Sequence, residues 1–306
     1  MRVDLNGRIV LSRPDGSHAH RLTDPFAPDG PRWSPDGTRI AYDKLYAASG
    51  TGVYVASAAS GRARRVGNGA LYQWSPDGRS VLVSAGTGFE LIDIASGRVT
   101  FGPVRGGGAV LSPDAHTIAF VRDPHRDEYG NSYDSVLYLV DVAGGDPRPL
   151  AQVHPVGDGL AFGDPVWAPD GKSVFIEQDD PVGEVEGAIR RLPLDGSPGR
   201  VLASEELSTF RNLTVSPTGD RLAYTTGSGI ETLTVADGSR HKLPHTPGGE
   251  LNELAWSPDG AELAFDDLTD ETPNGGLYVI AFDGTGRKLV SARSQAVDFF
   301  DWRPSR

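Results

Sequence analysis

One five-residue string, WSPDG or a close variant of it, recurs seven times along this chain of 306 residues. Successive copies lie 37 to 56 residues apart, a spacing that suits one four-stranded blade of a β-propeller per copy. The residue that opens each copy, here called the anchor, is Trp33, Trp74, Leu111, Trp167, Val215, Trp256 or Trp302.

The residues around each copy predict strands. After the string comes a short run rich in β-branched and aromatic residues, such as TRIAY from Thr38, and a second run follows, such as GVYVA from Gly52. A Gly-containing turn and a polar, often basic strand complete the unit. The chain is therefore predicted to be an all-β, seven-bladed propeller with four antiparallel strands per blade.

The string itself has the composition of a tight turn. Pro presets φ, Asp can accept hydrogen bonds from nearby backbone, and Gly tolerates a positive φ. We expect it to form the hairpin between the first and second strands of each blade, with the anchor packed where blades meet. Because its Ser and Asp recur in blade after blade, whereas a catalytic site normally occurs once, the string is interpreted as a structural joint.

The two ends of the chain complement each other. Met1 to Thr23 matches the second, third and fourth strands of a blade, and AVDFFDW from Ala296 supplies a first strand. WRPSR followed by MRVDL aligns position for position with WSPDG followed by TRIAY. We predict that the seventh blade is shared, so that the C-terminal strand closes the ring by pairing with N-terminal strands. The predicted units within one domain, 1–306, are 24–66, 67–101, 102–150, 151–202, 203–243, 244–290, and 291–306 joined to 1–23.

The succession of WSPDG, IAY or LAF, LYV and DG signals resembles the repeat of TolB-type β-propellers, a WD-repeat-like bacterial family, over essentially the whole chain. Similar blades occur in oligogalacturonate lyases and in the propeller domains of prolyl oligopeptidases. The resemblance implies the fold and says almost nothing about function. Because no His follows Asn252, the late His and Gln metal site of the lyases is not reproduced. The absence of a GxSxG string disfavours prolyl oligopeptidase activity.

Composition restricts the classes of partner. With 29 Lys and Arg against 41 Asp and Glu, the net charge of −12 disfavours nucleic acid and anionic membranes. The chain has no Cys and so no disulfide framework. Its N-terminal sequence has no signal-peptide pattern, and no stretch is long and apolar enough to span a membrane. We expect a cytoplasmic monomer, or a periplasmic or extracellular protein if a leader was removed.

Loop length predicts where ligands bind. The loops between the second and third strands, and those between blades, vary in length and carry most of the unusual residues. We call the side of the ring that carries them the variable-loop face and place the site there, over the central channel. The candidate ligand-binding residues are His125, Arg126, Asp127, Tyr129, His154, Asp158, Asp179, Arg211, His245, Glu253 and Asp267.

Some of these candidates have the chemistry of metal ligands. His125, His154 and His245, together with nearby carboxylates, could bind a divalent ion such as Zn or Mn, and the acidic loops could hold Ca. No two of them show the close spacing of a dedicated metal motif, so a solvated polar face is the favoured interpretation.

Two functional hypotheses remain. The first is a binding module that holds a protein, a peptide or a small ligand on the variable-loop face. The alternative is an enzyme, such as a lyase, hydrolase or cyclase of a bacterial secondary pathway, with acid and base groups drawn from His125, His154, His245, Asp179 and Asp267. The binding module is favoured because every recognisable motif is structural.

Overall fold

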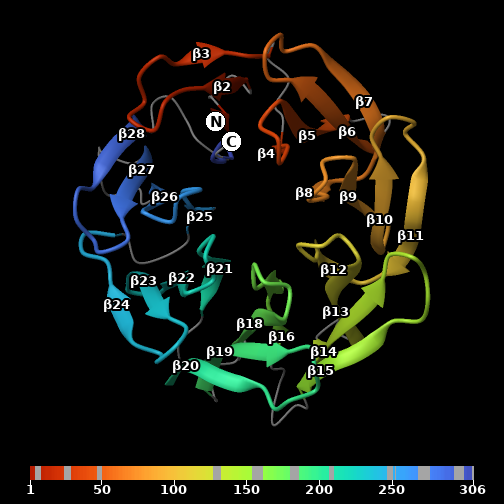
Figure 1. The fold of residues 1–306 in the computed structure, drawn as a ribbon, viewed down its shortest axis with the longest axis vertical. Helices are drawn as coiled ribbons and strands as arrows, with labels where there is room; N and C mark the ends of the chain where they lie inside the picture. Colours follow the sequence, from red (N-terminus) through yellow and green to blue (C-terminus); the bar gives the residue numbers. More distant parts are fainter. Residues whose placement is uncertain are drawn as a thin grey trace.

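The structure, a computed structural model, describes residues 1–3, 8–23, 29–46, 50–126, 132–153, 161–179, 186–206, 210–246, 251, 253–267, 276–292 and 300–304. Seven antiparallel sheets form a ring around a central axis, and both chain ends lie in one sector of it (Figure 1). No helix occurs among these residues, so none of them forms a helix able to cross a membrane.

Each blade runs from an inner strand at the axis to an outer strand at the rim. Blade 1 contains β4 (Asp29–Trp33), β5 (Arg39–Tyr46), β6 (Gly50–Ser57) and β7 (Ala63–Asn68). Blade 2 contains β8 (Leu71–Trp74), β9 (Ser80–Ala85), β10 (Gly88–Asp93) and β11 (Val99–Arg105). Blade 3 contains β12 (Gly107–Leu111), β13 (Thr117–Arg126), β14 (Ser132–Asp141) and β15 (Arg148–Val153).

The remaining blades complete the circle. Blade 4 contains β16 (Ala161–Phe162), β17 (Val166–Trp167), β18 (Ser173–Asp179), β19 (Glu186–Pro193) and β20 (Arg200–Glu206), and blade 5 contains β21 (Arg211–Val215), β22 (Arg221–Thr226), β23 (Gly229–Thr234) and β24 (Arg240–Lys242). Blade 6 contains β25 (Leu254–Trp256), β26 (Glu262–Asp267), β27 (Gly276–Ala281) and β28 (Lys288–Ala292). Blade 7 contains β1 (Arg2–Val3), β2 (Ile9–Leu11) and β3 (His20–Arg21). The predicted seven-bladed, all-β propeller is confirmed.

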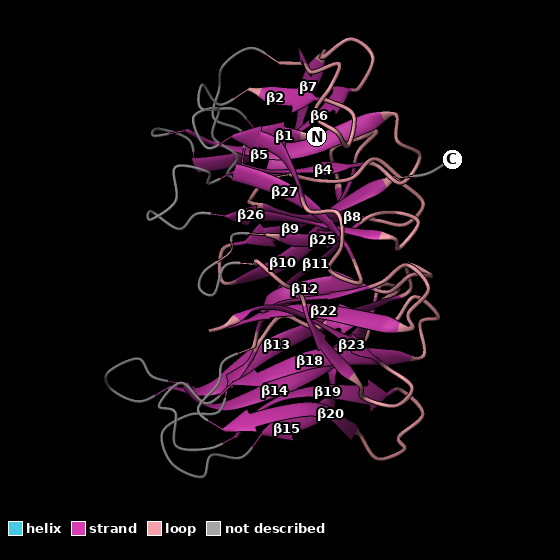
Figure 2. Cartoon of the chain, turned by 90° about the vertical axis from the view of Figure 1, so that its left-hand side faces the viewer, coloured by secondary structure: helices cyan, strands magenta, loops and turns pink. Residues whose placement is uncertain are grey.

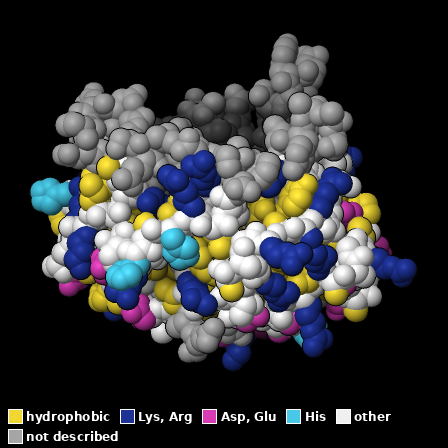
Figure 3. Space-filling view, turned by 90° about the horizontal axis from the view of Figure 1, so that it is seen from above, with side chains coloured by type: hydrophobic (Ala, Val, Ile, Leu, Met, Phe, Trp, Pro, Cys, Tyr) yellow, Lys and Arg dark blue, Asp and Glu magenta, His cyan; other side chains and the backbone are white. Residues whose placement is uncertain are grey.

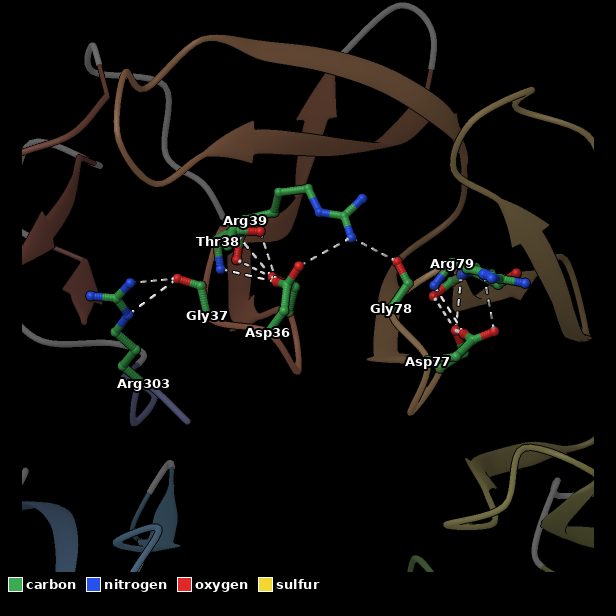
Figure 4. A network of polar contacts seen from close by, with 11 residues as sticks. Asp36, Gly37, Thr38, Arg39, Asp77, Gly78, Arg79 and Arg303 are labelled. Carbon is green, nitrogen blue, oxygen red and sulfur yellow. Dashed lines mark hydrogen bonds and ion pairs between the residues drawn. The ribbon is translucent and has the colours of Figure 1, made fainter. Parts of the chain in front are cut away.

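The WSPDG string forms the predicted hairpin. In blade 1, Ser34 Oγ donates to Asp36 Oδ1 (2.6 Å), and the same carboxylate oxygen accepts the backbone N–H of Thr38 (3.0 Å). Gly37 has a φ of 63°, in the region that Gly adopts without steric cost. These bonds are internal to the turn (Figure 4), which confirms that the string is a structural joint. In the edge-on view, the tight turns gather on one side, which we call the turn face (Figure 2).

The anchors fasten neighbouring blades together. Four of the Trp anchors are buried, with 5–8% of their surface exposed. Trp74 Nε1 donates to Arg32 O in the preceding blade (3.0 Å), and Trp167 and Trp302 make the corresponding bonds to Val110 O (3.1 Å) and Ala255 O (3.2 Å). A buried aromatic ring with a satisfied N–H holds two sheets in a fixed relation.

The shared seventh blade is confirmed, but its register differs from the sequence alignment. Arg2 pairs with Phe300 in an antiparallel bridge, and Met1 exchanges two main-chain hydrogen bonds with Asp301 (2.9 and 3.1 Å). The alignment placed Val3 opposite Trp302, so the observed pairing is offset by three residues. No hairpin joins these two strands, and register is then set by side-chain packing and main-chain bonding rather than by a turn.

Candidate functional site

Charged side chains meet on the innermost strands where blades 6, 7 and 1 come together. Arg32 of β4 forms an ion pair with Glu253, which immediately precedes β25 (Nη1 to Oε1, 2.7 Å). The other carboxylate oxygen of Glu253 accepts the backbone N–H of Phe300 (3.0 Å). Next along the same strand, Asp301 Oδ2 accepts the backbone N–H of Trp33 (2.8 Å). We call Arg32, Glu253 and Asp301 the closure cluster.

Burial controls the electrostatics of the closure cluster. Desolvation raises the pKa of Glu253, and the Arg32 guanidinium acts in the opposite direction by stabilising the carboxylate. Burial likewise raises the pKa of Asp301, again opposed by Arg32. One guanidinium therefore serves two carboxyl groups. About a third of the Arg32 side chain (34%) remains exposed, so a ligand at the axis can reach it.

A second polar group lies on the inner strands of blades 2, 3 and 4. Asp164, between β16 and β17, sits so close to Gly108 that a Cβ at that position would collide with Asp164 Oδ1. Burial raises the pKa of Asp164. Burial, followed by the charge of Asp164, also raises the pKa of Tyr72 on β8. The absence of a side chain at Gly108 thus makes room for a carboxyl group beside a phenol.

Four of the candidate residues are described with their side chains. Glu253 belongs to the closure cluster. Asp267, only 5% exposed, is ion-paired with Arg287 (3.3 Å), whose guanidinium also lies over the ring of Tyr278. His245 is exposed with a φ of 57°, and its carbonyl accepts a hydrogen bond from Arg287. Arg211 is exposed at the start of β21.

The other candidates are described only in part or not at all. His125 pairs with Asp134 in the β13–β14 register, Arg126 ends β13, and Asp179 pairs with Ala161, but their side chains lie outside the described residues. Beyond the described part of the chain lie Asp127, Tyr129, His154 and Asp158. Within the described part, no group of three or more His, Asp or Glu side chains is placed to hold a metal ion.

Sequence reasoning missed Arg32, Asp301, Asp164 and Tyr72. Each lies one to three residues before an anchor, on or beside the inner strand of its blade. A polar residue just before a buried anchor is the signal that could have identified them. Chemically, the inner strands offer a guanidinium, a phenol and three carboxyl groups of raised pKa, a set that can bind polar ligands or donate protons.

The comparisons with known proteins concern mainly the fold. No family model matches the chain. A curated relative, the uncharacterized peptidase YuxL of Bacillus subtilis (strain 168), is 30% identical over 161 residues, which are 53% of this chain and 22% of that protein. The match thus covers less than a quarter of the relative.

Three solved structures are similar throughout most of the chain. An oligogalacturonate lyase in complex with manganese has a TM-score of 0.71 at 18% identity, covering 98% of this chain and 88% of that one. A puromycin-hydrolyzing peptidase of Mycobacterium tuberculosis has a TM-score of 0.66 at 15% identity, with 94% and 52% covered. TolB of Acinetobacter baumannii has a TM-score of 0.56 at 18% identity, with 83% and 63% covered. At these identities the likeness shows the fold alone, and that fold is the β-propeller that TolB shares, as the repeat predicted.

Proposed function

We propose that the protein is a binding module whose variable-loop face holds a cationic segment of a peptide or protein partner. The observation that carries the proposal is the distribution of charge in a chain of net charge −12. Residues 177–187 contain Glu177, Asp179, Asp180, Glu184 and Glu186 and no Lys or Arg.

The same pattern recurs in a second long loop of the variable-loop face, whereas the long loops 43–51 and 122–135 contain Lys44, Arg122 and Arg126. Residues 266–276 contain three Asp and one Glu and no Lys or Arg. Asp266 and Asp267 are buried, and Asp267 is paired with Arg287, so Asp270 and Glu271 are the acidic residues of this loop that the proposal uses. The outer strands have the opposite character, as in ARRVGN of β7 and RHK of β24. Opposite charges on two partners accelerate encounter and favour one orientation of docking.

Structural roles account for the repeated motifs, which supports binding without turnover. The Ser and Asp of the WSPDG hairpin bond to each other and to the turn backbone in blades 1, 2, 3 and 6. What remains for a cationic ligand is the set of carboxylates that the two acidic loops carry.

The proposal is tested by fluorescence polarisation with a labelled octa-lysine peptide, using octa-glutamate as the charge control. The combined variant Asp179→Asn, Asp180→Asn, Glu184→Gln is expected to weaken octa-lysine binding about fivefold or more at low salt. A matched control removes three carboxylates from turns between third and fourth strands: Asp146→Asn, Asp195→Asn, Asp237→Asn. Equal weakening by both variants, or no saturable binding of octa-lysine, would overturn the proposal.

The alternative function is an enzyme that uses the same face. The raised pKa of Asp164 beside Tyr72 is the observation that favours it, because burial favours the protonated form of this carboxyl group and a protonated carboxyl group can act as a general acid. The solved neighbours include a lyase and a peptidase. Cleavage of oligogalacturonate with Mn²⁺, or of aminoacyl amides, that is lost in Asp164→Asn at unchanged melting temperature would establish this reading. We expect neither reaction, and we expect a monomer in light scattering.

A further inference from the structure

A cavity of about 340 Å³ lies between blades 6 and 7. Its apolar walls come from β27 and β28 of blade 6 and from the inner strand of blade 7, with Leu277, Val279 and Val290 facing Phe300 and Trp302. At its mouth are exposed side chains near the turn face: Arg13, His18, His20 and Arg303. None of these residues was singled out as a ligand site from the sequence, which pointed to the opposite face.

The cavity has an identifiable cause in the repeat. In each complete blade, one residue of the second strand pairs with the anchor, as Leu263 pairs with Trp256 in blade 6. The apolar residue two positions further along the second strand packs against the preceding blade. These side chains are at most 1% exposed: Tyr42, Val83, Phe120, Ile176, Tyr224 and Phe265.

Arg2 takes this position in blade 7. The register places it opposite Phe300, as Phe265 is placed opposite Leu254 in blade 6. Its side chain is buried (8% exposed), and Nη1 donates to Ser291 Oγ in β28 across the seam (3.0 Å). A flexible guanidinium side chain thus occupies a position that an apolar side chain fills elsewhere, and the space beside it stays open.

The walls and mouth of the cavity carry positive charge. Arg2 lies in the wall, and Arg13 and Arg303 lie at the mouth, whereas Asp301 is the one acidic residue among the described residues that line it. The Asp301 carboxylate already accepts the backbone N–H of Trp33. Figure 3 looks onto the rim of blades 7 and 1, where Lys and Arg predominate and His side chains lie beside hydrophobic surface.

The Nε1 group of Trp33 is a buried donor in the cavity wall. The Nε1 groups of Trp74, Trp167 and Trp302 each donate to a carbonyl of the preceding blade. For Trp33 the corresponding carbonyl is that of Asp301. That carbonyl accepts a hydrogen bond from the amino group of Met1 (2.9 Å) and none from Trp33 Nε1. Trp33 Nε1 has no partner within the described residues, although the side chain is only 8% exposed. Trp256 Nε1 is likewise unpartnered, but Trp256 packs in the seam of blades 5 and 6, away from this cavity.

We propose that this cavity is a binding site for a small monocarboxylate with an apolar body, such as a medium-chain fatty acid. The aliphatic and aromatic walls accommodate the apolar part, and its burial is favourable in proportion to the area removed from water. The carboxylate accepts hydrogen bonds from the buried Arg2 guanidinium and from Trp33 Nε1. A buried, charge-assisted pair of this kind is among the strongest hydrogen bonds in proteins.

The probe is sodium octanoate, and the readout is the intrinsic fluorescence of the untagged protein, since Trp33 and Trp302 line the cavity. Saturable quenching with a dissociation constant below about 1 mM is expected, together with a rise in melting temperature as ligand increases. Octanol matches the chain length without the charge and is expected to bind at least about tenfold more weakly. Equal affinity for octanol and octanoate would overturn the proposal, as would the absence of saturation.

Two variants locate the site. Arg2→Met replaces the guanidinium by an apolar side chain of similar length and is expected to weaken octanoate binding about tenfold or more. Val279→Phe fills the cavity and is expected to abolish binding without lowering the melting temperature. Its matched control is Val55→Phe, at the equivalent position in the closed seam of blades 1 and 2, which is expected to lower the melting temperature by overpacking and to keep octanoate binding. Undiminished binding by Val279→Phe would place octanoate elsewhere and overturn the proposal.

Discussion

Arg303, in the last blade, donates both Nε and Nη2 to the carbonyl of Gly37 in the first blade (3.1 and 2.9 Å) (Figure 4). The same guanidinium lies 5.3 Å from the ring centre of Trp33. Residues 266 positions apart in the chain are thereby joined across the seam that closes the ring. Arg39 makes a similar contact between blades 1 and 2, donating to Gly78 O (3.0 Å) while lying over Trp74.

Replacing Arg303 by Ala is expected to lower the free energy of unfolding by about 1–2 kcal/mol, because two charge-assisted bonds and a cation–π contact are lost. Arg39→Ala is the matched control, because Arg39 makes the same kind of contact from a strand that hairpins join to the rest of its blade, whereas no hairpin joins the strand before Arg303 to β1. We expect the larger loss for Arg303→Ala in urea denaturation. A smaller loss would mean that the seam between the last and first blades depends on other contacts.

Deleting residues 295–306 removes Phe300, Trp302 and Arg303, and with them the strand that pairs with Arg2. The variant is expected to unfold or to oligomerise through the exposed sheet edge. Light scattering and thermal melting check this, with a deletion of only the last two residues as the control. A monomer with unchanged melting would contradict closure by this strand.

Trp74→Ala is expected to cost about 3–5 kcal/mol, because a large buried side chain is truncated and its bond to Arg32 O is lost. Trp302→Ala, at an anchor that is only partly buried, is expected to cost less. Chemical denaturation of the two variants tests whether Trp74→Ala loses more free energy of unfolding than Trp302→Ala. A near-neutral Trp74→Ala would show that this anchor does not hold blades 1 and 2 together.

The Asp residues of the WSPDG hairpins should make the free energy of unfolding depend on pH in acid. The Ser34 hydroxyl, followed by the N–H and hydroxyl of Thr38, lowers the pKa of Asp36 from 3.8 to about 2. A carboxyl group whose pKa is lower in the folded state stabilises the protein above its unfolded pKa, and that stability is lost as pH falls through the folded value. Urea midpoints should therefore decline between pH 4 and pH 2. Asp36→Asn should reduce that decline, and an unchanged decline would exclude Asp36 as a contributor.

Arg32→Met tests the closure cluster through its pH dependence. The raised pKa of Glu253 means that its carboxylate is disfavoured by burial and relies on the Arg32 charge. A group with a raised folded pKa contributes stability below its unfolded pKa and loses it as pH rises through the folded value. Without Arg32, the cost of burying the Glu253 carboxylate should appear at the higher pH, where the group is ionised. The free energy of unfolding of the variant should therefore fall by about 2 kcal/mol at pH 8 and by less at pH 5. Equal losses at both pH values would contradict this account. Glu253→Gln should reduce the pH dependence, and the remainder should come from Asp301, whose pKa Arg32 also lowers.

The fold was predictable because its signals are local. Ser34, Pro35, Asp36 and Gly37 form a hairpin through bonds within a few residues of each other, and the same letters therefore mean the same turn in blade after blade. The candidate site was less predictable. Of the residues chosen from variable loops, Glu253 lies in a polar cluster at the axis, whereas Asp267 is ion-paired with Arg287 between strands.

The amino-acid sequence by itself determined the seven blades, the turn in each and the closure of the ring by the two chain ends, because turn chemistry and strand periodicity depend on near neighbours. Only the tertiary structure decided that Arg32 meets Glu253 and that Arg2 lies opposite Phe300. The first contact joins blade 1 to blade 6, and the second joins the C-terminal strand to β1 within blade 7, so each brings together segments from opposite ends of the chain. Without a connecting turn, their register depends on packing and hydrogen bonding in three dimensions.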